Sequence, residues 1–235
     1  MKKFKLTSEF IVDISGVKLF RIKALIEFGN VKAGDLGGYI EKEENLSHMG
    51  NAWVSGNAQV SGDARVSGNA RVSGDAQVFG DARVSGNARV SGDAQVFGDA
   101  RVSGNARVSG NARVSGDARV FGNAQVSGDA RVFGNARVSG DARVFGNAWV
   151  FGNAQVFGDA RVSGDKDYAY AHGFGSCNRT TTFFRLKDGD VGVRCGCFYG
   201  TLAQFRDNVC ETHGETKKAQ EYLMLADLMD FRFKN

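Results

Sequence analysis

The stretch DARVSGNARVSGDAQVFG at residues 63–80 decides the fold, and it recurs letter for letter at residues 81–98. In the surrounding array, valine stands at every sixth position from Val54 to Val162, with alanine two positions before each valine and glycine two positions after it. Alternate residues of a strand share a face, so each Ala-Val pair is expected to point inward. The Gly-Asn or Gly-Asp that follows tolerates a positive φ and predicts a sharp corner.

A longer repeat period of 18 residues is superimposed on the period of six. Asp63 recurs as Asp81, and Asn51 recurs as Asn69. Three hexads per turn would make a triangular coil in which like residues stack on successive rungs. Recent duplication of an 18-residue block is the alternative, although it leaves the hexad as the unit. At about 4.8 Å per rung, about six turns form a prism roughly 30 Å long.

The array divides the chain into three segments. Residues 1–45 are read as a small N-terminal β cap with a turn at Ser15-Gly16, residues 46–165 as the coil, and residues 166–235 as a C-terminal α+β domain. The fold class expected is therefore mainly β. Because the end of a coil is an open sheet edge, the two flanking segments are expected to cover the ends.

The last segment contains signals for a hairpin and two helices. TTTFFRL and VGVRCGCF flank KDGD, which predicts a hairpin with Asp-Gly in its turn. TLAQFRDNVCETHG predicts a helix with Thr201 as N-cap and Gly214 as its stop, and KKAQEYLMLADLMDFRF predicts a second, amphipathic helix.

The unit V-S-G-N-A-R resembles the hexapeptide repeat of left-handed β-helix proteins, and this resemblance covers roughly half of the chain. It implies a single-stranded, left-handed β-helix, although bactofilin-like filaments use triangular coils of the opposite hand. The lead-in GNVKAGDLGGYIEKEENLS, followed by GNAWV, also resembles repeat proteins of bacteria and their prophages that are often labelled polymer-forming.

Sorting the outward positions by 18 separates three faces, of which the first is the least charged and the most aromatic. Contiguous exposed apolar patches often mark contacts with partners. The alternative is that these rings only stack on neighbouring rungs and on arginine stems. The candidate interface residues are Phe79, Phe97, Phe133, Trp149 and Phe151.

Arginine ladders on the other two faces raise the question of nucleic acid. Residues 51–165 hold 12 Arg and 10 Asp, without Lys or Glu, and many arginines stand two positions after an aspartate, as in Asp63-Ala-Arg65. Mutual neutralisation along the stack is the simpler interpretation, so nucleic acid is not the expected partner. The coil also lacks the histidines that hexapeptide acyltransferases and related carbonic anhydrases use, and the threonine rows of ice-binding solenoids.

Metal or nucleophile chemistry would have to come from the last 70 residues. Cys195 and Cys197 are expected on one side of a strand, and Cys210 and His213 on one side of a helix, so a zinc site is geometrically allowed. The spacing is not one of the established zinc patterns, and the alternation from Val191 to Cys197 equally fits a buried apolar face. A Cys210–His213 nucleophilic pair lacks an orienting third residue.

The run HGFGSCNRTTT is a polar, glycine-containing loop that could bind an anion through backbone N–H groups or serve as a simple linker. If a small phosphorylated ligand is captured, the candidate residues are Gly175, Ser176, Arg179 and Thr180.

These observations favour a non-enzymatic, rigid scaffold that self-assembles or binds a protein partner, most simply as a homo-oligomer. The alternative is a ligand-capturing or catalytic C-terminal domain on an oligomerisation stalk. A third hypothesis is a phage-encoded factor that acts on the host. No signal peptide or apolar span is evident, so a cytoplasmic chain with reduced thiols and no membrane contact is expected. No cofactor is expected unless the cysteines hold zinc.

Overall fold

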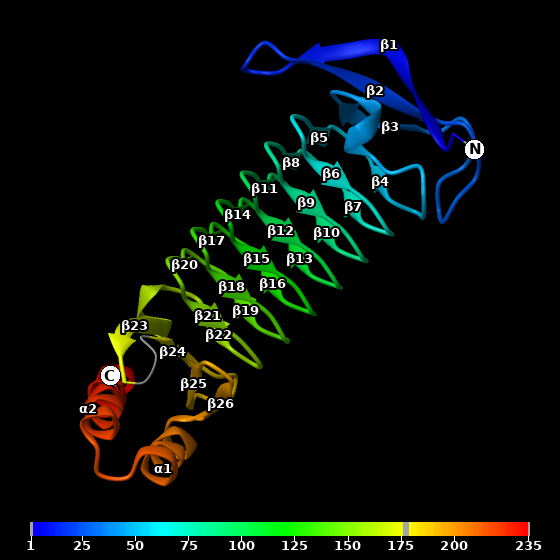
Figure 1. The fold of residues 1–235 in the computed structure, drawn as a ribbon. Helices are drawn as coiled ribbons and strands as arrows, with labels where there is room; N and C mark the ends of the chain where they lie inside the picture. Colours follow the sequence, from blue (N-terminus) through cyan, green and yellow to red (C-terminus); the bar gives the residue numbers. More distant parts are fainter. Residues whose placement is uncertain (1, 176–178, 235) are drawn as a thin grey trace.

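The computed structural model describes residues 2–175 and 179–234, and Figure 1 shows that the chain forms a rod. A coil of short strands makes up the middle of the rod. Strands from the N-terminal segment lie at one end, and a small sheet with two helices lies at the other end. The mainly β architecture is therefore confirmed.

The coil contains 19 strands, β4 to β22, each two residues long and one in every hexad. Each strand pairs in parallel with the strand three places further along the chain, so that Arg89 lies opposite Arg107. The N–H of Arg89 donates to the carbonyl of Ala106 at 2.9 Å. The predicted turn of three hexads and 18 residues is confirmed.

The three sides of the coil are named here by the side chains that they present. The aromatic face consists of β5 (Gln59–Val60), β8 (Gln77–Val78), β11 (Gln95–Val96), β14 (Arg113–Val114), β17 (Arg131–Val132) and β20 (Trp149–Val150). The Asp-Arg face consists of β6 (Arg65–Val66), β9 (Arg83–Val84), β12 (Arg101–Val102), β15 (Arg119–Val120), β18 (Arg137–Val138) and β21 (Gln155–Val156). The Asn-Arg face consists of β4 (Trp53–Val54), β7 (Arg71–Val72), β10 (Arg89–Val90), β13 (Arg107–Val108), β16 (Gln125–Val126), β19 (Arg143–Val144) and β22 (Arg161–Val162).

The hexads contribute alanine and valine to the core of the coil. Every repeat alanine and valine from Ala52 to Val162 is fully buried, as the alternation predicts. The glycines at the corners have positive φ, for example +68° at Gly104, a conformation that glycine adopts without steric cost. The same two side chains, one small and one larger, therefore fill the interior at every hexad.

The N-terminal segment adds a turn that the hexad pattern does not predict. It contains β1 (Phe4–Val12), β2 (Lys18–Ala24) and β3 (Leu36–Ile40), of which β3 pairs in parallel with β5. Leu46 forms a parallel bridge with Val66. The lead-in thus completes one turn without hexad sequence, and the solenoid has about 7 turns rather than about six. β1 and β2 extend the same sheet in antiparallel fashion.

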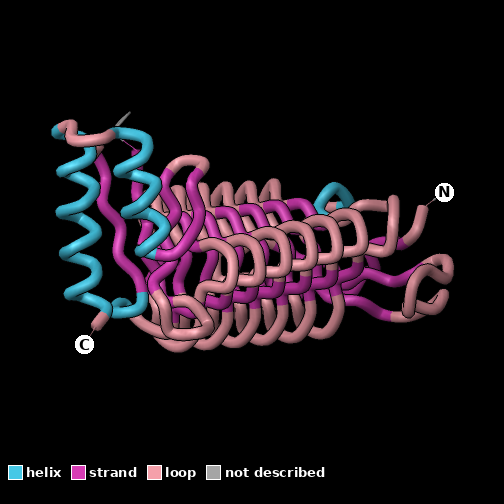
Figure 2. The backbone as a smooth tube through the Cα atoms, turned by 90° about the horizontal axis from the view of Figure 1, so that it is seen from below, coloured by secondary structure: helices cyan, strands magenta, loops and turns pink. Residues whose placement is uncertain are grey.

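The C-terminal cap is a sheet between the coil and two helices (Figure 2). Its antiparallel strands are β23 (Tyr168–Phe174), β24 (Arg179–Arg185), β25 (Val191–Cys195) and β26 (Phe198–Thr201). Successive residues of β24 point to opposite sides, so Phe184 joins the core of the coil whereas Phe183 packs with the helices.

The predicted hairpin and helices of this segment are confirmed. β24 and β25 pair around the Asp-Gly turn. Helix α1 (Leu202–His213) starts at Thr201, whose hydroxyl accepts the N–H of Gln204 at 3.3 Å, and stops at Gly214. Helix α2 (Lys217–Phe233) follows. Within the described part of the chain, neither helix combines the length and the apolar character that a membrane crossing requires.

Candidate interaction surfaces

The aromatic face carries two separate clusters of rings. The first is a parallel stack of Phe79 and Phe97, whose ring centres lie 4.9 Å apart at an interplanar angle of 1°. The second joins Phe133 to Phe151, at 5.3 Å and 11°, and to Trp149, at 6.2 Å with the rings edge to face. The rung between the clusters carries Ser115 instead of a ring. The structure therefore brings together the five predicted interface residues as a pair and a trio.

Part of the second cluster is covered by the C-terminal cap. Tyr168 and Tyr170 of β23 place their rings edge-on to Phe151, at 6.4 and 5.9 Å between centres. Arg131 lies over Trp149, with 4.8 Å between the guanidinium carbon and the ring centre. Even so, Trp149 remains 42% exposed and Phe151 remains 38% exposed. Ring stacking and the C-terminal cap therefore cover only part of the Trp149 and Phe151 side chains, and the rest of each ring contacts solvent.

The two ends of the coil are open sheet edges whose unpaired backbone groups need partners from the flanking segments. At the first turn, the ammonium group of Lys3 donates to the carbonyls of Ala52 at 2.8 Å and Gly50 at 3.3 Å. The amide of Asn45 donates to the carbonyls of Gly62 at 3.0 Å and Ala64 at 2.9 Å. Both side chains supply donors where donors are needed.

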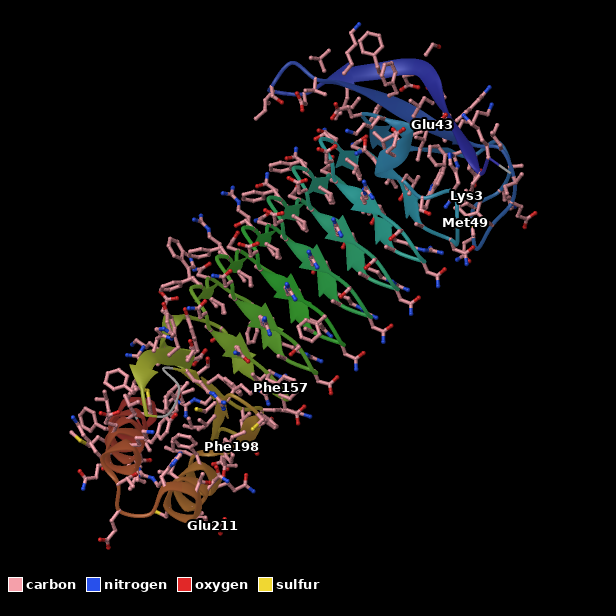
Figure 3. All side chains as sticks on the ribbon, viewed as in Figure 1. Lys3, Glu43, Met49, Phe157, Phe198 and Glu211 are labelled. Carbon is pink, nitrogen blue, oxygen red and sulfur yellow. The ribbon has the colours of Figure 1, made fainter. Side chains whose placement is uncertain are left out.

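Lys3 is buried at this end. Figure 3 shows it at the N-terminal end of the rod, near Met49. Its ammonium group also lies 4.6 Å from the centre of the Phe28 ring. Burial lowers the pKa of Lys3 from 10.5 to about 8. The side chain thus stays at the end of the coil even though burial disfavours its charge.

At the last turn the cap supplies acceptors. The N–H of Gln155 donates to the hydroxyl of Thr182 at 2.9 Å, and the N–H of Trp149 donates to the Asp165 carboxylate at 3.2 Å. Tyr168 packs here as well, and burial raises the pKa of its phenol well above the usual value. Both ends are therefore closed by side chains from the flanking segments.

The outer edge of the N-terminal sheet is β1. Its pairing with β2 is interrupted by a bulge between Leu6 and Phe10. The strand also carries charged residues at Lys5 and Glu9. Bulges and charges on an edge strand are devices by which proteins prevent edge-to-edge pairing.

The predicted anion loop is only partly described, since Ser176 lies outside the described residues. The N–H of Gly175 donates to the carboxylate of Glu221 at 2.8 Å, which places an acid where an anion was expected. Thr180 is hydrogen-bonded through its hydroxyl to Nδ1 of His172 at 3.0 Å. Arg179 lines a different cavity, of about 310 Å³, together with Cys195 and His213.

The expectation that Cys195 and Cys197 lie on one side of a strand is wrong. Gly196, with φ +57°, and Cys197 form the turn of a hairpin in which Cys195 pairs with Phe198. Cys195 is buried, and its sulfur accepts the Thr181 hydroxyl at 3.2 Å, whereas Cys197 is exposed in the turn.

The other two predicted zinc ligands lie on α1. Cys210 is exposed, and His213 stacks on Tyr222 with ring centres 5.8 Å apart. Within residues 2–175 and 179–234, no three His, Cys, Asp or Glu side chains lie where they could hold a metal ion together. The four predicted ligands are thus not assembled into one set.

Sequence reasoning missed the residues that close the first turn. Nothing in the local sequence separates Lys3 from Lys2 and Lys5, because its burial depends on a carbonyl 49 residues away. For Asn45, the hint was its place directly before the array, where a donor for open carbonyls is required.

Comparison with protein families supports the repeat architecture. Residues 58–152 are similar to the YdcK β-solenoid repeat, matched in overlapping segments at 58–74, 64–80, 76–98, 94–110, 100–114, 106–122, 112–128, 124–138 and 136–152. The match lies within the coil and does not extend into either cap. No curated protein sequence matches the chain.

Proposed function

We propose that this protein is a non-enzymatic scaffold, a rigid rod that associates side by side with a second copy through its aromatic face. The observation that carries the proposal is the pair of ring clusters, Phe79 with Phe97 and Phe133 with Trp149 and Phe151, on one face of the coil. Aromatic side chains in such patches contribute strongly to protein contacts. Both clusters lie on one face, so one flat partner surface can cover both.

The closed ends favour lateral over end-to-end association. Lys3 and Asn45 occupy the carbonyls of the first turn, and Thr182 and Asp165 occupy N–H groups of the last turn. Another coil docking end to end would have to displace these side chains and the caps that carry them. A sideways contact disturbs neither end.

The rod suits a scaffold because its turns repeat one set of interactions. The rungs share the same valine-alanine core and the same backbone hydrogen bonds of about 2.9 Å. In such arrays each repeat contacts only its neighbours, which holds the two caps at a set separation. A cytoplasmic location belongs to this proposal, and the free thiols of Cys195, Cys197 and Cys210 accord with it.

The test is the mass in solution, measured by light scattering on the unchanged chain and on the double variant Phe79→Glu/Phe133→Glu. The matched control is Phe121→Glu/Phe145→Glu, because these residues occupy the same hexad position on the other two faces and are 38% and 37% exposed. We expect a dimer that dissociates in the first variant and persists in the control. A monomeric unchanged chain, or equal dissociation of both variants, would refute the aromatic face as the interface.

A further inference from the structure

The arginines on the early rungs of the Asn-Arg face differ from those on the early rungs of the Asp-Arg face in the residue two positions before them. Arg65 and Arg83 follow Asp63 and Asp81 by two positions, so an acid precedes each arginine in sequence, although neither pair lies within ion-pair distance. On the Asn-Arg face, Arg71, Arg89 and Arg107 follow asparagines instead. The preceding corner therefore carries an acid on the early rungs of one face and a neutral amide on the early rungs of the other, where only the later Arg143 and Arg161 follow an aspartate.

The asparagines at this corner form a ladder of hydrogen bonds along the rod. The amide of Asn69 donates to Asn87 at 3.1 Å, Asn87 donates to Asn105 at 3.1 Å, and Asn105 donates to Asn123 at 3.0 Å. The ladder satisfies the amides with each other and brings no negative charge to the arginines beside them.

The guanidinium groups themselves are left without internal partners. Across residues 2–175 and 179–234, no acid lies within ion-pair distance of Arg71, Arg89 or Arg107, and their side chains are exposed. Consecutive rungs are about 4.8 Å apart, so neighbouring guanidiniums stand close enough to contact one small anion together.

A segment of the N-terminal region overhangs these arginines and turns the face into a groove. Two adjoining cavities, of about 580 and 440 Å³, lie between residues 29–36 and the Asn-Arg face, and Asn30, Arg71 and Arg89 line both. Ser55, Ser73 and Ser91 also line the larger cavity.

The overhang is held in place by its own contacts. Phe28 and Val31 exchange backbone hydrogen bonds of 2.9 and 3.0 Å, and the ring of Phe28 meets Trp53 edge to face at 5.4 Å. Trp53 stands on the rung before Arg71 and is nearly buried, so it closes one end of the groove. The acid on the wall, Asp35, accepts the N–H of Lys32 at 2.8 Å.

We infer that this groove is a binding site for a small anion that carries a phosphoryl group, held by Arg71 and Arg89. Guanidinium groups match phosphoryl oxygens with two parallel hydrogen bonds, and serine hydroxyls with the Asn30 amide supply further donors around the same space. This site is independent of the aromatic face.

The test is calorimetric titration of the full chain with pyrophosphate at low salt. The variant Arg71→Gln/Arg89→Gln removes both guanidiniums from the groove. Its matched control, Arg65→Gln/Arg83→Gln, removes two arginines from the same position of the hexad on the Asp-Arg face. We expect saturable binding that weakens about ten-fold or more in the groove variant and less than about two-fold in the control.

A second arm replaces pyrophosphate with citrate, which has a similar charge but offers carboxylates. We expect citrate to bind more weakly than pyrophosphate. Equal binding of the two anions would overturn the assignment to phosphoryl groups. Absence of saturable binding, or equal weakening in both variants, would overturn the site itself. Unchanged circular dichroism and mass of the variants show that folding is retained.

Discussion

Replacing Gly104 by alanine tests the packing of the coil at one of its corners. Gly104 has φ +68°, and a Cβ atom added there would lie 3.0 Å from both the nitrogen and the oxygen of Gly122 on the next rung. The backbone of that rung is fixed by its own hydrogen bonds, so it cannot move away freely. Alanine therefore meets two problems at this position, its own conformation and its neighbour.

The magnitude can be built from these two contributions. A left-handed conformation costs a non-glycine residue about 1–2 kcal/mol. Crowding against fixed atoms adds about 1–3 kcal/mol. Alanine also lowers the conformational entropy of the unfolded chain, which offsets about 0.4–1 kcal/mol of this loss in stability. We therefore expect Gly104→Ala to lower the free energy of unfolding by about 1–4.5 kcal/mol, centred on about 3 kcal/mol.

The assay is urea denaturation followed by circular dichroism, with two controls from the same chain. Gly164 has extended backbone, with φ −162°, and an added Cβ there meets no atom within 4 Å. Gly16 has φ +83° and is equally unobstructed. Alanine should be almost neutral at Gly164 and should cost no more than about 1.5 kcal/mol at Gly16, where only the conformation opposes it and the unfolded-chain entropy offsets part of that cost. If Gly104→Ala costs no more than Gly16→Ala, the contact between rungs is not tight and the reasoning fails.

Three further changes probe the core, an end and a corner of the rod. Val108→Ala empties a fully buried position and should cost about 2–3 kcal/mol in urea denaturation, whereas Ser109→Ala, an outward change beside it, should stay within about 0.5 kcal/mol. Because burial lowers the pKa of Lys3 from 10.5 to about 8, the unfolded chain binds a proton between these values that the folded chain does not. Stability should therefore rise from about pH 8 to pH 10.5 and stay level below pH 8. Denaturation midpoints across this range should show the rise for the unchanged chain and lose it in Lys3→Met; the same slope in both would contradict the assignment. Asn105→Ala removes a donor and an acceptor from the ladder and should cost about 0.5–1.5 kcal/mol by thermal unfolding, while an unchanged midpoint would show that the exposed ladder adds nothing.

The sequence predicted those features of the C-terminal cap that depend on interactions between residues close together in the chain. The Thr201 cap and the Gly214 stop of α1 depend on residues three or four positions apart, so the sequence shows both. The error at Cys195 and Cys197 came from treating alternation as proof of one continuous strand. A glycine between two apolar residues also permits a tight turn, and the pairing of β25 with β26 favours that turn.

Contacts on the candidate surfaces could likewise be predicted only where they depend on the repeat spacing. The stacking of Phe79 on Phe97 followed from the 18-residue spacing, because residues one turn apart must lie on adjacent rungs. The partial cover of Phe151 by Tyr168 and Tyr170 did not follow, because it depends on the path by which the chain leaves the coil.

The sequence by itself determined the hexad, the turn of three hexads, the buried valines and alanines, and the assignment of side chains to three faces. Each of these features depends on residues two, six or 18 positions apart, and the same spacing recurs in every hexad or turn of the array. The tertiary structure alone decided how Lys3 reaches the carbonyl of Ala52 and how residues 29–36 come to overhang Arg71 and Arg89. Those contacts occur once and join non-repeating segments to the coil, so they depend on chain reversals that no period encodes.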